Sequence, residues 1–160
     1  MRVGIGYDIH KLVDSEESNL ILAGVPIPFK KKCVAHSDGD VAVHALIDAL
    51  LGATALGDIG THFPDTDPIY KNADSALLLQ KCCKLVKETG FCIENVDMSI
   101  IAEKPKLAPY ILQMRNRLAE LMNMDVKRIS IKAKTNEQLD AVGREDAVAT
   151  HAVVLVHDNP

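Results

Sequence analysis

Residues 33–70 constrain the fold more than any other part of the chain, because this acidic, histidine-containing segment encloses a strongly apolar helix. The segment holds six aspartates and three histidines but no lysine or arginine. Its apolar run at 41–56 predicts a helix that Gly57 ends. Ser37 is the expected N-cap, with Asp40 in the capping-box position three residues later. Carboxylates and imidazoles without a basic residue are typical of a site for a divalent metal ion.

Alternation and turn residues predict the remaining elements. Strands are expected at residues 2–10, 20–29, 91–103, 128–134 and 146–157, and two further helices at 74–89, capped by Asn72 or Asp74, and at 107–124. Gly4 and Gly6 in the first strand indicate a close approach of the backbone to another element or a bulge. The second strand contains two prolines and is expected at a sheet edge, followed by a solvated turn at 30–32.

Two polar segments are expected to be loops. The first, residues 57–70, is 14 residues long, and its glycines, prolines and aspartates predict a flap that orders on a ligand. The second is 135–145. The element order predicts an α+β fold, a single domain over residues 1–160, with a mixed sheet and helices packed on one face. The sequence contains no glycine-rich dinucleotide fingerprint and no P-loop.

Composition argues against several partners. A net charge of −4, 4% aromatics and no tryptophan disfavour a nucleic-acid surface. No apolar run reaches 18 residues, so no membrane partner is expected. No secretory signal precedes the first strand, which favours a cytoplasmic location in a bacterium, or a plastid form after removal of its transit peptide. The four cysteines lack metal-ligand spacing and are expected to be reduced packing residues.

A candidate metal set combines a strand and a helix. Asp8 and His10 are two residues apart, so a strand places both side chains on one face. With His44, they provide two imidazoles and one carboxylate and leave a fourth tetrahedral position open, as in catalytic zinc sites. A lone helical histidine such as His44 is more often an ordinary interior or boundary residue. Asp48, one turn further, is expected either to orient His44 or to be a solvent-facing helix charge.

Two other groups suit phosphate. His36 and Ser37 precede the central helix, where backbone N–H groups attract anions, although Ser37 is also explained as a simple cap. The segment 132–137, KAKTNE, ends a strand with two lysines, Thr135 and Glu137. It could hold phosphate oxygens, with Glu137 offering an oxygen ligand to Mg²⁺, or it could be a solvated turn.

Five segments together resemble one known family. They are D-x-H at 8–10, AHSDGDVAVHALIDALLGA at 35–53, LGDIGTHFPDTDP at 56–68, IIAEKPKLAPY at 100–110 and KAKTNE at 132–137. They closely resemble the methylerythritol cyclodiphosphate synthase family, and the similarity covers nearly the whole chain. The resemblance implies a step of non-mevalonate isoprenoid synthesis. The 2-phosphate of 4-diphosphocytidyl-2-C-methyl-D-erythritol 2-phosphate attacks the β-phosphorus, CMP leaves, and 2-C-methyl-D-erythritol 2,4-cyclodiphosphate forms.

The resemblance also implies roles for matching residues. Asp8, His10 and His44 would bind one Zn²⁺ per subunit, and Glu137 would help to hold Mg²⁺ or Mn²⁺ on the substrate. His36 and Thr135 would hold phosphate oxygens in the transition state. The substrate-binding positions would be Ser37, Asp58, Gly60, Phe63, Asp65 and Asp67 for the methylerythritol part, Ala102, Pro105, Lys106 and Ala108 for the cytosine, and in addition Ala133, Lys134 and Arg144.

The same resemblance implies a homotrimer with sites shared between neighbouring subunits, helices outside and sheets facing the three-fold axis. One segment departs from the family pattern. Many members read roughly GFTGR where this chain has an aspartate, Ala141, Val142, Gly143 and Arg144. The aromatic residue of relatives lines a cavity on the three-fold axis where isoprenoid diphosphates are proposed to bind, and Ala141 removes that side chain.

Two other functions fit the residue pattern without the resemblance. A metal-dependent phosphohydrolase would use the same ions to deliver water to phosphorus, and a closing loop that excludes water argues against it. A non-catalytic nucleotide- or metal-binding module would signal through its trimer without turnover. Such a module would not need His36 and Thr135 around a reacting phosphorus.

Overall fold

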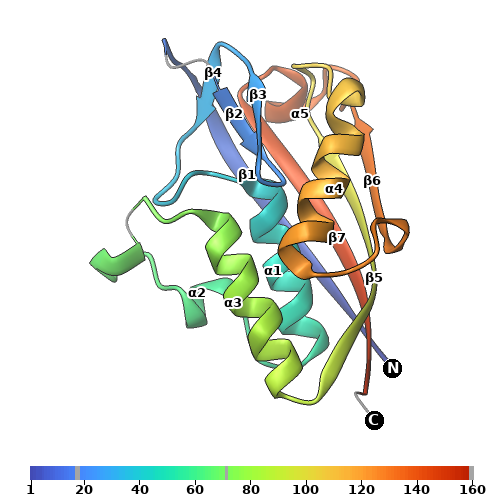
Figure 1. Cartoon of the computed structure of the whole chain (residues 1–160). Coiled ribbons are helices and arrows are strands. Elements are labelled where there is room, and N and C mark those ends of the chain that lie inside the picture. The colour runs from blue at the N-terminus through green and yellow to red at the C-terminus, as the bar shows by residue number, and fades with distance from the viewer. Residues whose placement is uncertain (17–18, 71, 159–160) are drawn as a thin grey trace.

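The computed structural model describes residues 1–16, 19–70 and 72–158, and a mixed five-stranded sheet forms its backbone framework (Figure 1). The strand order is β4-β1-β7-β5-β6, and only the β5–β6 pair is parallel. The strands are β1 (Arg2–Asp14), β4 (Lys31–Cys33), β5 (Phe91–Ile101), β6 (Ile129–Lys134) and β7 (Ala147–Asp158). Two further strands, β2 (Asn19–Leu22) and β3 (Val25–Pro28), form a separate hairpin.

Three helices cover one face of the sheet (Figure 1). They are α1 (Val41–Ala53), α3 (Ser75–Glu88) and α4 (Ile111–Met122), and α1 contacts β1 and β7 directly. Shorter helical turns are α2 (Ile59–His62), α5 (Asp140–Gly143), η1 (Pro68–Tyr70), η2 (Ala108–Tyr110) and η3 (Val126–Arg128). The predicted α+β fold, with a mixed sheet and helices on one face, is confirmed. Within the described part of the chain, no helix has the length and apolar character needed to cross a membrane.

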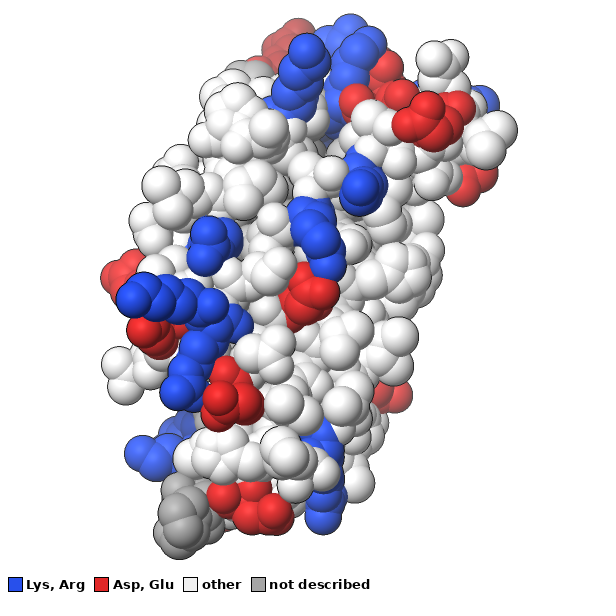
Figure 2. All heavy atoms as spheres, turned by 90° about the vertical axis from the view of Figure 1, so that its right-hand side faces the viewer, with Lys and Arg blue, Asp and Glu red and all other residues white. Residues whose placement is uncertain are grey.

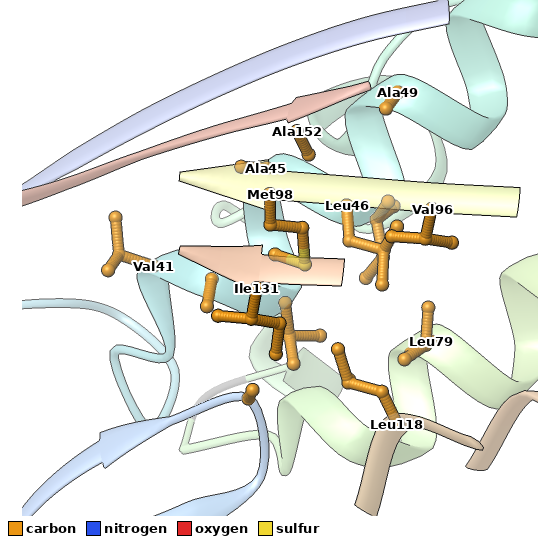
Figure 3. Close-up of a cluster of buried hydrophobic side chains, with 14 of the residues drawn as sticks. Val41, Ala45, Leu46, Ala49, Leu79, Val96, Met98, Leu118, Ile131 and Ala152 are labelled. Atoms are coloured by element: carbon orange, nitrogen blue, oxygen red, sulfur yellow. The ribbon is translucent and has the colours of Figure 1, made fainter. Parts of the chain in front are cut away.

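Helix α1 is buried on nearly every side. Ten of its 13 residues are buried, and the other three, His44, Asp48 and Gly52, lie four residues apart and form one stripe. Figure 3 shows Ala45, Leu46 and Ala49 of α1 among core side chains of the strands and of α3 and α4. The fold therefore leaves a single side of its central helix for polar chemistry, and His44 lies on that side.

The glycines of β1 let α1 lie against the strand. A Cβ atom added at Gly6 would lie 1.9 Å from the carbonyl oxygen of Ala45, and one at Gly4 would lie 1.9 Å from that of Ala49. No side chain fits at such distances, so the expected close backbone approach is confirmed. This contact fixes how α1 sits on the strand that carries Asp8 and His10.

The predicted cap of α1 is wrong. Asp40, not Ser37, is the N-cap, and its carboxylate accepts hydrogen bonds from the N–H groups of Ala42 and Val43, both at 3.1 Å. The same carboxylate accepts from Ala23 (2.9 Å) and Gly24 (2.6 Å) in the β2–β3 turn. Burial raises the pKa of Asp40 to about 6, although the N–H donors act in the opposite direction. The long-range bonds to the hairpin decide which residue caps the helix.

Other expected boundaries also change. The edge strand expected at 20–29 is the β2–β3 hairpin, because Ala23 and Gly24 both adopt positive φ angles and turn the chain. The expected turn at 30–32 instead begins β4, which pairs with the end of a longer β1. The loop 57–70 contains α2 and η1, and 135–145 contains α5. Asp74 caps α3, as one of the two alternatives predicted.

The second face of the sheet carries exposed apolar side chains. The largest of them on β1 and β7 are Val3, Ile5, Tyr7, Ile9 and Val153, each at least 41% exposed. Figure 2 shows the side of the molecule that lies at the right of Figure 1, with broad uncharged areas between scattered charged side chains. Contiguous apolar surface of this kind is typical of an interaction face.

Candidate functional site

Asp8, His10 and His44 converge although 36 residues separate the first from the last. Asp8 and His10 lie on β1 and His44 on α1. His44 Nδ1 lies 3.0 Å from Asp8 Oδ2 and 3.1 Å from His10 Nε2, and His10 Nε2 lies 3.3 Å from Asp8 Oδ2. Within the described ranges, this is the only group of three or more histidine, cysteine or acidic side chains close enough together to hold a metal ion.

The spacing of these three atoms fits a small tetrahedral ion. Zinc ligands at about 2.0–2.1 Å in tetrahedral geometry lie roughly 3.3–3.4 Å from one another. The three distances of 3.0, 3.1 and 3.3 Å are close to that value. Two imidazole nitrogens and one carboxylate oxygen are also ligands that zinc accepts. The residues present therefore fit a divalent metal with an open coordination position.

The two histidines respond differently to their surroundings. Burial lowers the pKa of His10, although the neighbouring Asp8 carboxylate acts in the opposite direction. Burial also acts to lower the pKa of His44, but the hydrogen bond and charge of Asp8, with the charges of Asp40 and Asp38, outweigh it and raise the pKa. Negative charge thus gathers around His44, and a cation bound by this group would meet favourable charge.

His44 is also held from its other ring nitrogen, by Ser37 and by Ser75, a residue that the sequence did not single out. His44 Nε2 lies 2.8 Å from Ser75 Oγ at the start of α3 and 3.1 Å from Ser37 Oγ. Ser75 donates its hydroxyl to Asp38. No local pattern connects Ser75 with a residue 31 positions earlier, and only the packing of α3 on α1 brings them together.

A cavity of about 360 Å³ opens beside the metal group. Its walls include the three candidate ligands together with His36, Ser37, Gly60, Phe63 and Asp65, and also Ala35, Asp48, Ile59, Tyr70 and Leu78. The segment 57–70 thus forms one wall, where the Phe63 and Tyr70 rings pack edge to face with their centroids 5.5 Å apart. A larger hollow of about 720 Å³ between the ends of α3 and α4 lies away from this group.

Neither of the two roles expected for Asp48 describes its contact. Asp48 Oδ1 accepts a 2.7 Å hydrogen bond from the Ile59 N–H, so it attaches the 57–70 segment to α1. Burial raises the pKa of Asp48. The exposed Asp58 caps α2 by accepting from Thr61, and Asp67 accepts from Ile69; neither lines the cavity.

Most of the other predicted substrate residues lie at or near β6, the edge strand that β7 and β5 separate from β1. We call residues 102–108 and 133–137 the β6-edge group. A 2.9 Å hydrogen bond from Ala102 N to Lys134 O joins the two segments of this group. Within the second segment, the Thr135 hydroxyl donates to the Glu137 carboxylate at 2.7 Å. Glu103, which sequence reasoning missed, accepts from Asn136 N at 3.2 Å.

The metal group and the β6-edge group are separated within one chain. Asp8 pairs with Thr150, Thr150 with Ile100, and Ile100 with Ala133, so a row of four residues crosses the sheet. Three strand spacings of about 4.8 Å place Ala133 roughly 14 Å from Asp8. The remaining predicted residue, Arg144, follows α5 and lies 3.4 Å from Asp146. The cavity around the metal group is therefore built without the β6-edge group.

The fold and the site define an α+β protein with a candidate divalent-metal centre in the wall of a pocket. The chain matches the model of the YgbB family over residues 1–157. It is 53% identical to the 2-C-methyl-D-erythritol 2,4-cyclodiphosphate synthase of Ectopseudomonas mendocina, over 98% of each chain. The chain belongs to the YgbB family and is an enzyme of the cyclodiphosphate synthase type.

Solved structures agree with this assignment. Bifunctional IspDF from Campylobacter jejuni superposes with a TM-score of 0.92 at 41% identity, over 98% of this chain and 42% of that protein. IspF of Plasmodium falciparum in a CDP complex superposes with a TM-score of 0.86 at 35% identity, over 99% of this chain and 97% of that one.

Proposed function

We propose that the chain converts 4-diphosphocytidyl-2-C-methyl-D-erythritol 2-phosphate into 2-C-methyl-D-erythritol 2,4-cyclodiphosphate and CMP, as a lyase of isoprenoid biosynthesis. The observation that carries the proposal is the Asp8–His10–His44 group in the wall of the pocket. In a member of the cyclodiphosphate synthase family, such a group is expected at the reacting diphosphate. The CDP complex of the Plasmodium relative supports a cytidine nucleotide as part of the substrate.

The reaction balances without water. An oxygen of the 2-phosphate forms a bond to the β-phosphorus, and the bond from the β-phosphorus to the oxygen of CMP breaks. Asp8, His10 and His44 would hold Zn²⁺, which when bound supplies Lewis-acid stabilisation of charge on a phosphoryl oxygen. The protein's remaining task is to position the two phosphates and to exclude water.

The residues of the pocket suit that task. His36 and Ser37 line the cavity together with the metal group, where they would bind phosphate oxygens. Phe63 and Tyr70 place apolar surface at the same cavity, which would keep water from the β-phosphorus. On the β6-edge group, the Thr135 hydroxyl orients Glu137, whose carboxylate would help to hold a second ion, Mg²⁺ or Mn²⁺.

A shared site in a homotrimer explains the separation within one chain. The β6-edge group lies about 14 Å from Asp8 across the sheet. We propose that a neighbouring copy brings its β6-edge group, with the cytosine-binding residues 102–108, to the pocket of the first. The exposed apolar face of β1 and β7 would then face the three-fold axis, where burial of Val3, Ile5 and Tyr7 stabilises the assembly.

Measured CMP release tests this function. The zinc-loaded wild-type enzyme with Mg²⁺ should release one CMP and form one cyclic diphosphate for each substrate consumed, and His44→Ala should lose both bound zinc and activity while remaining a trimer in analytical ultracentrifugation. An active, zinc-replete His44→Ala enzyme would contradict the ligand assignment.

A further inference from the structure

We propose that Ser75 and Asp38 are positioning residues that fix the tautomer and ring orientation of His44, so that Nδ1 presents its lone pair to the metal. The proposal rests on the metal-dependent function above, and it concerns residues outside the ligand set. The observation that carries it is a hydrogen-bonded chain of three side chains from His44 through Ser75 to Asp38.

The direction of this chain follows from the chemistry of its far end. A carboxylate accepts hydrogen bonds and has no proton to donate. Asp38 accepts from both the hydroxyl and the backbone N–H of Ser75, the latter at 3.0 Å. The Ser75 hydroxyl proton is therefore committed to Asp38, and its oxygen is left to accept from the His44 Nε2–H at 2.8 Å.

The proton on Nε2 determines what the other nitrogen can do. A neutral imidazole carries one N–H and one lone pair, so a proton on Nε2 leaves Nδ1 as the lone-pair nitrogen. Nδ1 is the atom that lies 3.0 Å from Asp8 Oδ2 and 3.1 Å from His10 Nε2. Ser75 and Asp38 thus select the tautomer that can bind a metal between the three residues.

Because Ser75 is buried, a water molecule cannot easily take the place of its hydroxyl group. Ser75, the first residue of α3, is fully buried. Its hydroxyl is not needed to cap α3, because Asp74 already accepts from the Ala76 N–H at 2.9 Å. The hydroxyl is thus available for His44, and the two Asp38 bonds hold the first residue of α3 in position.

Ser37 provides a matched comparison on the same ring nitrogen. Its oxygen lies 3.1 Å from His44 Nε2 and also accepts from Gly39 N at 3.2 Å. Among the residues that the structure describes, no carboxylate contact fixes the direction of the Ser37 hydroxyl in the way that Asp38 fixes that of Ser75. We therefore expect Ser37→Ala to weaken zinc binding much less than Ser75→Ala.

Two measurements test the proposal without using activity. In competition with a chromophoric chelator, Ser75→Ala should bind Zn²⁺ about 10- to 100-fold more weakly than wild type, the range typical for loss of a hydrogen-bond partner of a metal ligand. Ser75→Thr, which keeps the hydroxyl, should recover most of the affinity. Wild-type affinity in Ser75→Ala, or equal losses in Ser75→Ala and Ser37→Ala, would overturn the proposal.

The second measurement needs no variant. Long-range proton–nitrogen NMR of the zinc-loaded wild type should show His44 with a proton on Nε2 and none on Nδ1, and a proton on Nδ1 would overturn the proposal. These outcomes are distinct from failure of the proposed function. That failure would appear as a wild-type protein that binds no zinc through Asp8, His10 and His44, or that binds zinc and does not cyclise the substrate.

Discussion

Replacing Gly6 with alanine tests how tightly the central helix must lie on the strand that carries two of the candidate ligands. The new Cβ would lie 1.9 Å from the Ala45 carbonyl oxygen, 2.8 Å from Ala49 N and 2.9 Å from the Ala45 carbonyl carbon. Ordinary contact begins at 3.4 Å, so β1 and α1 would have to separate by about 1.5 Å. All three neighbours are backbone atoms of α1 and cannot rotate away.

The magnitude follows from overpacking in a core that cannot adjust. Inserted methyl groups cost typically 1–3 kcal/mol, and backbone neighbours place this site at the upper end, about 3 kcal/mol of unfolding free energy. The same separation would move His44 away from Asp8 and His10, which now lie within 3.3 Å of one another. We therefore also expect at least a tenfold loss in zinc affinity.

Gly52→Ala is the matched control on the same helix. A Cβ there meets only the Ile5 carbonyl oxygen at 3.9 Å, so the substitution should raise the free energy of unfolding by about 0.5–1 kcal/mol through helix propensity. Urea unfolding followed by circular dichroism would measure both variants. The reasoning would be refuted by a Gly6→Ala protein within about 0.5 kcal/mol of wild type.

Three further predictions concern the metal ions and the helix cap. Zinc at about 1,000 times its Kd should raise the unfolding free energy of the metal-free protein by roughly 4 kcal/mol, and stabilisation that persists in His44→Ala would exclude this site as its origin. Glu137→Gln should weaken the Mg²⁺ dependence of turnover and should affect the zinc content, measured by metal analysis, less. Equal loss of both ions would count against separate sites. Asp40→Ala should lower the free energy of unfolding by about 2–4 kcal/mol in urea titrations, because four N–H groups, three of them buried, lose their acceptor; an unchanged midpoint would contradict that role.

Local sequence patterns predict the elements, and the shared strand face of Asp8 and His10, well. The two-residue spacing of Asp8 and His10 is enough to place them on one face of a strand, and the apolar run after Asp40 is enough to define a buried helix. The glycines of β1 also predict the close approach of α1, because no larger side chain fits there. These inferences succeed since each depends on residues near one another in the sequence.

The errors about Ser37, Ser75 and Asp48 arise because residues distant in the sequence determine the contacts of these side chains. Ser37 and Asp40 are both good caps, and the choice is made by N–H groups of Ala23 and Gly24 in a hairpin 16 or more residues away. Ser75 similarly acquires its role from α3 packing on α1, which local periodicity does not describe. Asp48 attaches the 57–70 segment through Ile59, a contact that helical spacing alone could not predict.

The most direct test of the central claim is the phosphorus NMR spectrum of the product formed in oxygen-18-labelled water. Wild-type enzyme with Zn²⁺ and Mg²⁺ should give the cyclic diphosphate and stoichiometric CMP, with no labelled oxygen in either. A linear phosphate product carrying label would mean that water is the nucleophile and would establish hydrolysis instead. Bound zinc and nucleotide without any product would show that the pocket binds its ligand and does not catalyse the cyclisation.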